Sequence, residues 1–221
     1  MWQYSASRLF ASTHGLAMKA KPIQFFNSAI PRIEGKKHYF HKELVTGHFL
    51  PDFAPGKQYV FRGTFERFEY FIGRENEVKS WCTPQKTTDD SPNARDLVIS
   101  IRRGWNNWPA ESHCPDHEYY INLLAKFKYR KLWICTDSPD DPYFVKLAKS
   151  VNFEIYRGSA VEQFNFIMRA NRYVMAPSTF SFWASWVGAA EEIYWPKIPA
   201  LNFEGTKHNW RPITDSRIVD I

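Results

Sequence analysis

The chain has 221 residues, of which 44% are hydrophobic and 17% are aromatic. This composition supplies ample apolar surface for a core and excludes an intrinsically disordered chain. The length fits one large domain or two small ones, and the formal net charge of +6 fits an anionic partner such as nucleic acid, a phosphorylated metabolite or an anionic membrane surface.

Before residue 83 the sequence predicts few regular elements. Apolar residues recur at helical spacing over residues 1–19, which predicts a helix that ends before Pro22. The other elements expected in this part are a strand at 23–26, an irregular segment at 27–57, a strand at 59–62 and a helix at 66–72. Residues 83–95 contain two prolines, three threonines and only one apolar residue, so we predict a domain boundary there.

From residue 96 onward, predicted strands alternate with predicted helices. Strands are expected at 96–102, 131–136, 153–156, 173–176 and 193–195, and helices at 117–127, 143–150, 161–170 and 180–189. Because the strands are apolar on both faces, this pattern predicts a parallel sheet with helices packed on either side. The expected domains are an N-terminal domain over 1–94, a parallel-sheet domain over 95–200 and a C-terminal extension over 201–221.

Residues 173–190 form an uncharged run of eighteen, which is at the short end for a membrane span. Pro177, Ser178, Thr179 and Ser181 interrupt its first half, so a buried strand, a polar turn and a buried helix are the better interpretation, with no membrane span. The N-terminus lacks the charged start and apolar core of a signal peptide, and a cytoplasmic location is therefore predicted.

Metal and disulfide chemistry have little support in the sequence. The three cysteines form no CxxC pair, which excludes a disulfide framework and argues against structural zinc. No two histidines form an HxxxH pair within a predicted helix, and the GxGxxG and Walker phosphate motifs are absent. We therefore predict neither a metal nor a bound cofactor.

Ligands of an open parallel sheet bind at the carboxyl ends of its strands. Three predicted loops, at 102–108, 136–141 and 177–181, follow strands in this way. The last loop leads into a helix, whose first N–H groups and positive dipole end suit a phosphate. Alternatively, Ser178 or Thr179 merely caps that helix.

Three charged residues are candidates for ligand contact. Arg102 and Arg103 end a strand, where alternation sends their side chains to opposite faces. One of them can point into the crevice and bind a diphosphate through two hydrogen bonds, while the other is structural. Alternatively, both are solvated surface charges. Asp137 follows a second strand and can accept hydrogen bonds from a sugar hydroxyl or a base N–H, unless it only caps a helix or forms a turn.

Four segments of the second half carry a resemblance to a known family. They are SIRRGW at 100–105, EYYINLLAK from Glu118, CTDSPDDPYF from Cys135 and STFSFWASW at 178–186. Together they resemble the nucleotide-sugar half of the alpha-1,2-fucosyltransferases, which are inverting, GDP-fucose-dependent enzymes with a GT-B-type fold. The first segment is similar to a His-x-Arg-Arg-Gly-Asp signature, and the last is the most specific of the four.

The N-terminal half fits the same family more loosely, through MWQYSASRLFASTHGLAM and FRGTFERFEYF. The chain departs from the family pattern at Ser100, where the signature has His, and at Trp105, where it has Asp. The glycine-rich opening strand and loop of the family would precede Met1. The resemblance thus implies a GT-B-like α/β fold with a Rossmann-type C-terminal domain and a smaller, incomplete N-terminal α/β domain.

The resemblance also implies roles for individual residues. Arg102 would bind the donor diphosphate and stabilise the leaving nucleotide without a metal, and Arg103 is a lesser candidate for the same region. Asp137 would lie near the nucleoside. The residues that would offer backbone and hydroxyl donors to the phosphates are Ser178, Thr179, Phe180 and Ser181.

The function implied is transfer of a sugar, by default L-fucose from GDP-fucose, to a glycan hydroxyl with inversion. The partners would be this donor and a glycan acceptor rather than nucleic acid, and a homo-oligomer is compatible with the sequence. His14 and Glu66 are candidates for the catalytic base. Two other functions stay open: a weakened nucleotide-sugar or glycan-binding protein, because of Ser100 and Trp105, and a nucleic-acid-associated protein, because of the charge and the aromatic content.

Overall fold

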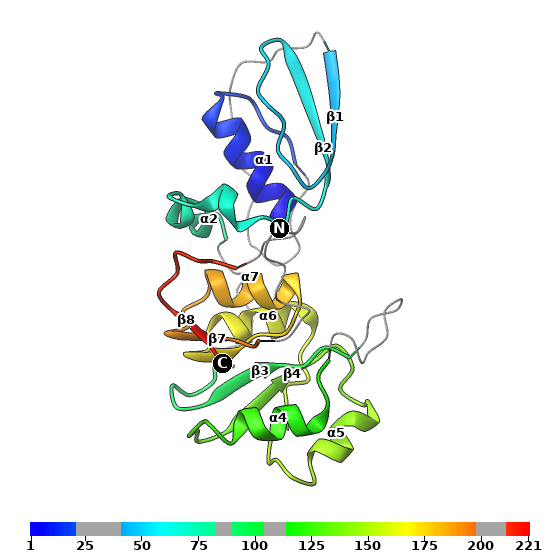
Figure 1. Cartoon of the computed structure of the whole chain (residues 1–221), viewed down its shortest axis with the longest axis vertical. Helices are drawn as coiled ribbons and strands as arrows, with labels where there is room; N and C mark the ends of the chain where they lie inside the picture. Colours follow the sequence, from blue (N-terminus) through cyan, green and yellow to red (C-terminus); the bar gives the residue numbers. More distant parts are fainter. Residues whose placement is uncertain (21–40, 83–89, 104–113, 198–210) are drawn as a thin grey trace. The chain divides into compact units, whose positions relative to one another are not determined.

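The computed structural model describes residues 1–20, 41–82, 90–103, 114–197 and 211–221 (Figure 1). The chain divides into two units, each formed from two pieces. Unit 1 comprises Met1–Pro84 and Phe203–Pro212, and unit 2 comprises Gln85–Asn202 and Ile213–Ile221. The domains expected at 1–94, 95–200 and 201–221 stay predictions.

Unit 1 consists of short elements around a two-stranded sheet. Its elements are α1 (Trp2–Thr13), β1 (His41–Gly47), β2 (Lys57–Gly63), the 3₁₀ turn η1 (Phe68–Phe71) and α2 (Glu75–Ser80). β1 and β2 run parallel, and buried Val45 of β1 packs with Ala6 of α1 and with Phe65. The helix at the N-terminus and the strand at 59–62 are confirmed, although α1 ends at Thr13, shortly before Gly15 adopts a left-handed φ of +61°.

Other predictions for unit 1 were wrong or fall outside the described residues. β1 lies within the segment expected to be irregular. Its charged sequence, HKELVTG, did not predict a strand, but pairing with β2 supplies its backbone hydrogen bonds. The helix at 66–72 is a single 3₁₀ turn, in which Phe68 and Phe71 are three residues apart and both buried. The strand expected at 23–26 lies outside the described residues.

Unit 2 contains a six-stranded sheet in which every pair is parallel. Its strands are β3 (Leu97–Ser100), β4 (Leu132–Cys135), β5 (Glu154–Ile155), β6 (Arg172–Val174), β7 (Glu192–Trp195) and β8 (Ile218–Asp220). Its helices are α4 (His117–Leu124), α5 (Pro142–Leu147), α6 (Ala160–Met168) and α7 (Thr179–Val187). The strand order is β5-β4-β3-β6-β7-β8, which is the usual 3-2-1-4-5-6 order of a doubly wound sheet.

The parallel sheet and the alternating elements predicted after residue 96 are confirmed, with ends that shift by a few residues. β8 was missed: it pairs with β7, so the strand at 193–195 is not the last one. Residues 173–190 form the strand, turn and helix that were predicted. Within the described parts of the chain, no helix combines the length and the apolar character needed to cross a bilayer.

The helices cover both faces of the unit 2 sheet, with α4 and α5 on one side and α6 and α7 on the other (Figure 1). Leu97 and Ile99 of β3 join the core cluster formed with α4 and α5. Residues of opposite parity face α6 and α7, as shown by Trp133 against Phe166 and by Tyr173 against Ser181. This alternation decides on which side each residue after β3 emerges.

Candidate functional site

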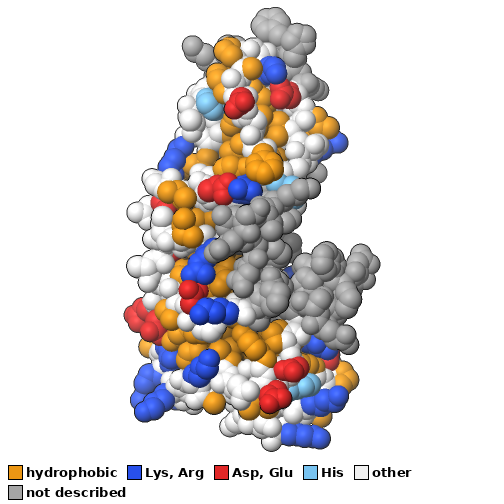
Figure 2. Space-filling model, viewed as in Figure 1, with side chains coloured by type: hydrophobic (Ala, Val, Ile, Leu, Met, Phe, Trp, Pro, Cys, Tyr) orange, Lys and Arg blue, Asp and Glu red, His pale blue; other side chains and the backbone are white. Residues whose placement is uncertain are grey.

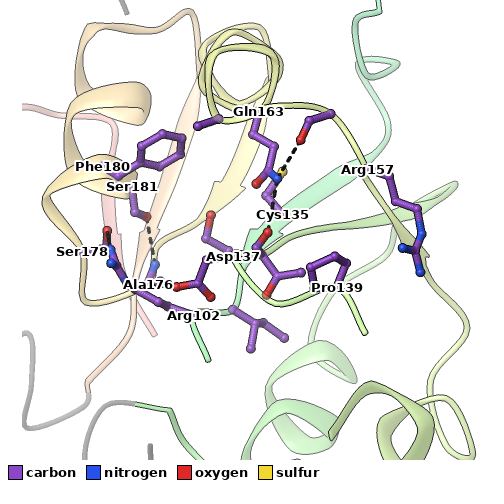
Figure 3. Close-up of a pocket in the computed structure, with 15 residues that line it drawn as sticks. Arg102, Cys135, Asp137, Pro139, Arg157, Gln163, Ala176, Ser178, Phe180 and Ser181 are labelled. Carbon is purple, nitrogen blue, oxygen red and sulfur yellow. Dashed lines mark hydrogen bonds and ion pairs between the residues drawn. The ribbon is translucent and has the colours of Figure 1, made fainter. Parts of the chain in front are cut away.

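A cavity of about 510 Å³ opens in unit 2 at the carboxyl ends of β3, β4 and β6 (Figure 3). β3 and β6 are neighbours in the sheet, and the strand order reverses between them. Crevices at such a reversal are the usual ligand sites of doubly wound sheets. All three loops proposed from the sequence contribute to the lining, although residues 104–108 of the first lie outside the described chain.

Arg102 lies at the mouth of this cavity and connects two of its walls. Its Nη1 donates a hydrogen bond to Ser178 Oγ over 3.0 Å, and its Nε lies 3.3 Å from Asp137 Oδ2. About a third of the side chain, 35%, is exposed, so a ligand can reach it. Burial lowers the pKa of Arg102 from its ordinary value while Asp137 opposes this shift, and the guanidinium stays charged near neutral pH.

Arg103 emerges on the opposite face, as the alternation along the strand predicted. Its Nε lies 3.2 Å from Asp141 Oδ2, and its guanidinium carbon is 4.6 Å from the centre of the Tyr143 ring. It does not line the cavity, whereas Arg102 does. Neither arginine is therefore merely a solvated surface charge, and only Arg102 is placed to touch a ligand in this cavity.

Asp137 joins the loops that follow β3 and β4. One of its carboxylate oxygens accepts the backbone N–H of Arg103 over 2.9 Å, and the other pairs with Arg102. Asp137 does not cap α5, because Asp141 is the capping residue and accepts the N–H of Tyr143 over 2.8 Å. The carboxylate thus orients Arg102 and remains one-third exposed at the cavity.

The start of α7 forms the wall opposite Asp137. Ser178 is the N-cap residue, yet its side chain makes no capping hydrogen bond and accepts from Arg102 instead. Thr179 is already the first helical residue, so Ser178 occupies the N-cap position that the sequence offered, but its hydroxyl pairs with Arg102 rather than with the helix backbone. Ser178 and Phe180 line the cavity and Thr179 does not. A helix start of this kind directs N–H groups and a positive dipole end toward a bound anion.

Ser181, also expected to contact the donor, is only 1% exposed. Its Oγ accepts the N–H of Ala176 over 3.0 Å and shares a 2.5 Å hydrogen bond with the Tyr173 hydroxyl, which donates to Ser100 Oγ over 2.6 Å. Burial raises the pKa of Tyr173, so its hydroxyl keeps its proton. Of the two departures from the family signature, Ser100 is thus part of this buried group, and Trp105 lies outside the described residues.

Sequence reasoning missed several further residues of the lining, of which Gln163 and Arg157 have polar side chains. The Gln163 amide nitrogen donates to the carbonyl oxygens of Thr136, over 3.2 Å, and Gly158, over 3.1 Å (Figure 3). Because both partners are acceptors, the orientation of the amide is fixed. Arg157 pairs with exposed Asp140. Neither residue belongs to a motif, and only the position of the β5–α6 loop and the start of α6 at the strand ends could have indicated them.

His14 and Glu66, the candidate bases, belong to unit 1. There the His14 ring stacks on Phe53, with ring centres 4.3 Å apart. The described residues contain no group of three or more His, Cys, Asp or Glu side chains that could hold a metal ion.

The sheet order and the cavity place unit 2 in the class of Rossmann-like α/β domains, and an arginine beside a helix start gives that cavity the features of a phosphate site. The model of glycosyl transferase family 11 matches residues 48–212, which cover most of the chain and all of the cavity, and the chain belongs to this family. Membership implies glycosyltransferase activity on nucleotide-sugar and glycan substrates. A search among curated proteins gives no significant match.

Proposed function

We propose that this protein transfers L-fucose from GDP-fucose to a hydroxyl of a glycan, with inversion at the donor carbon. The observation that carries the proposal is the contact between Arg102 and Ser178 at the reversal of the strand order. It brings a partly exposed guanidinium to the N-terminus of α7, so that two sources of positive potential converge on one side of the cavity. A nucleoside diphosphate is the ligand that this combination suits.

The proposed reaction is one direct displacement. The acceptor oxygen forms a bond to the anomeric carbon of the donor while the bond from that carbon to the diphosphate oxygen breaks. The negative charge that develops on the leaving GDP is stabilised by Arg102 and by the start of α7, a task that needs no metal. The acceptor proton passes to a base from the N-terminal half, for which His14 and Glu66 remain candidates.

The other residues take supporting roles in this proposal. Asp137 orients Arg102 and offers an acceptor to the nucleoside. The backbone at Thr179 and Phe180 faces the phosphates, while Ser181 and Arg103 hold the elements that carry these groups. The N-terminal unit would bind the acceptor, as in a GT-B-type enzyme.

Calorimetric titration with GDP, GDP-fucose and UDP-glucose tests the proposal. The wild-type protein is expected to bind GDP and GDP-fucose, and Arg102→Ala is expected to weaken GDP binding about tenfold to a hundredfold, because it removes charged hydrogen bonds worth about 1.5–3 kcal/mol. Arg102→Lys, which keeps the charge but loses the planar fork, should fall between the two. Arg95→Ala is the matched control, since it removes the same charge from an exposed position of unit 2.

Each competing function gives a different result. A wild-type protein that binds none of these nucleotides contradicts the proposal. Binding of GDP-fucose without hydrolysis or transfer would favour a nucleotide-sugar-binding protein. Salt-sensitive binding to random oligonucleotides, with no effect of nucleotide sugars, would favour a nucleic-acid-associated protein. On the face drawn in Figure 2, Lys and Arg side chains of the described residues are interspersed with Asp and Glu rather than gathered in one basic patch.

A further inference from the structure

A chain of three buried hydroxyl groups lies at the inner end of the cavity. Tyr173 donates to Ser100 over 2.6 Å and is 2.5 Å from Ser181. Because a tyrosine hydroxyl has a single proton, the Ser181 hydroxyl must be the donor in the second bond. All three residues are buried: Ser100 is 7% exposed, Tyr173 is 0% exposed and Ser181 is 1% exposed. Water therefore does not supply these hydrogen bonds.

This chain connects the parts of the fold that carry the proposed phosphate groups. Ser100 is the last residue of β3, and Arg102 follows on the same face. At the other end, Ser181 lies in the first turn of α7 and its Oγ accepts the N–H of Ala176, which follows β6. Ser178 lies between Ala176 and Ser181 in the sequence, and this hydrogen bond holds both of these residues in place. The hydroxyl chain therefore fixes the separation between the end of β3 and the start of α7.

Stability alone does not require hydroxyl groups at these positions, since most of the buried side chains of unit 2 are apolar. A hydrogen-bonded polar chain differs from an apolar core in being directional: its hydrogen bonds form at one separation and one orientation of the elements it joins. Such a property is useful where two groups must be held at a fixed spacing for a ligand.

We propose that Tyr173 is a positioning residue for the diphosphate, whose hydroxyl holds the start of α7 and the end of β3 at the spacing that lets Arg102 and the helix N-terminus contact the same phosphates. The ligand part of this inference rests on the proposed function. The mechanical part, that the Tyr173 hydroxyl holds the start of α7, does not.

Hydrogen exchange of the unliganded protein tests the mechanical part. Tyr173→Phe keeps the ring and removes only the hydroxyl, and we expect faster amide exchange in a peptide covering residues 176–182. Tyr194→Phe is the matched control. Tyr194 is also buried, but its hydroxyl bonds to Arg172 and Glu192 at the amino ends of β6 and β7, away from the cavity, and exchange at 176–182 should be unchanged. Ser181→Ala provides a second test should the tyrosine variant fold poorly.

Affinities for GDP and guanosine test the ligand part. Tyr173→Phe should bind GDP roughly tenfold more weakly and guanosine about as well as the wild type, because only the phosphate contacts lose their spacing. Equal losses for GDP and guanosine would indicate a merely structural hydroxyl and overturn the positioning role. Unchanged exchange at 176–182 in both variants overturns the proposal whether or not GDP binds. A wild type without GDP affinity contradicts the proposed function and the ligand role of Tyr173, while the exchange result still decides the mechanical part.

Discussion

At the scale of single residues, a buried charged side chain of unit 2 is stabilised by specific hydrogen-bond partners, and Asp96 is the clearest case. Its side chain is 1% exposed and accepts from Arg130 Nε over 2.8 Å, from Trp133 Nε1 over 3.1 Å and from the N–H of Asn93 over 3.0 Å. Burial alone would raise the pKa of this carboxyl. The hydrogen bonds from Arg130 and Trp133 outweigh the burial and hold the pKa below its ordinary value.

This depressed pKa predicts how stability depends on pH. The contribution of Asp96 is present above the pKa of an unfolded aspartate, about 4, and is lost as the pH falls through the lower folded value. Asp96→Asn should therefore cost about 1–2 kcal/mol at pH 7 and should flatten the decline of the unfolding free energy between about pH 5 and pH 3. Urea unfolding across this range measures the effect. Asp140→Asn, at an exposed ion pair, should leave the curve unchanged, and parallel curves for wild type and Asp96→Asn would contradict the assignment.

The structure around single residues also explains which parts of the site could be predicted from the sequence and which could not. The opposite directions of Arg102 and Arg103 follow from strand alternation, which is local. Their partners do not: Arg102 meets Asp137 and Ser178, which are distant in the sequence and come close only when β3, β4 and β6 align. The buried role of Tyr173 could not be foreseen for the same reason, since an aromatic residue in an apolar strand predicts only packing.

At the scale of elements, the helices α6 and α7 approach each other closely where they end. Gly188 follows α7, and the Ala189 N–H donates to the carbonyl of Met168 over 2.7 Å. A Cβ added at Gly188 would lie 2.7 Å from the Ala184 carbonyl oxygen and 2.7 Å from the Cα and carbonyl oxygen of Met168. All three of these atoms belong to the backbone and cannot move aside as a flexible side chain could.

Gly188→Ala should therefore destabilise unit 2 by about 1–3 kcal/mol, the usual range for overpacking. The measurement is the midpoint of thermal unfolding, followed by a signal from unit 2. Gly56→Ala serves for comparison, because a Cβ at Gly56 meets nothing within 4 Å and is disfavoured only by the left-handed φ of +81°. A midpoint for Gly188→Ala equal to that of the wild type would show that the two helices can separate at little cost.

The helices and strands also differ in how well their own sequences predict them. The strands and helices after residue 96 have apolar periodicity of their own, so they could be predicted within a few residues. β8 has only three residues and is defined by its pairing with β7, which local sequence does not encode. α2 has six residues, few of them apolar, and was likewise missed. Short elements of this kind depend on tertiary contacts that a sequence pattern does not contain.

At the scale of the whole molecule, part of the net positive charge lies where it can bind an anionic ligand, at the cavity of unit 2. The net charge of +6 alone admits any anionic partner, but the cavity is lined by unit 2 residues and offers Arg102 beside the start of α7. The family match extends over residues of both units. The central claim is thus that the nucleotide diphosphate binds at the reversal of the strand order in unit 2.

A crystal structure of the protein with GDP bound tests this claim most directly. We predict that the diphosphate oxygens lie within hydrogen-bond distance of the Arg102 guanidinium and of backbone N–H groups in the first turn of α7. The nucleoside should extend across the end of β4 toward Asp137 and Gln163. GDP bound with its diphosphate away from both Arg102 and α7, for instance beside Arg157, would contradict the account.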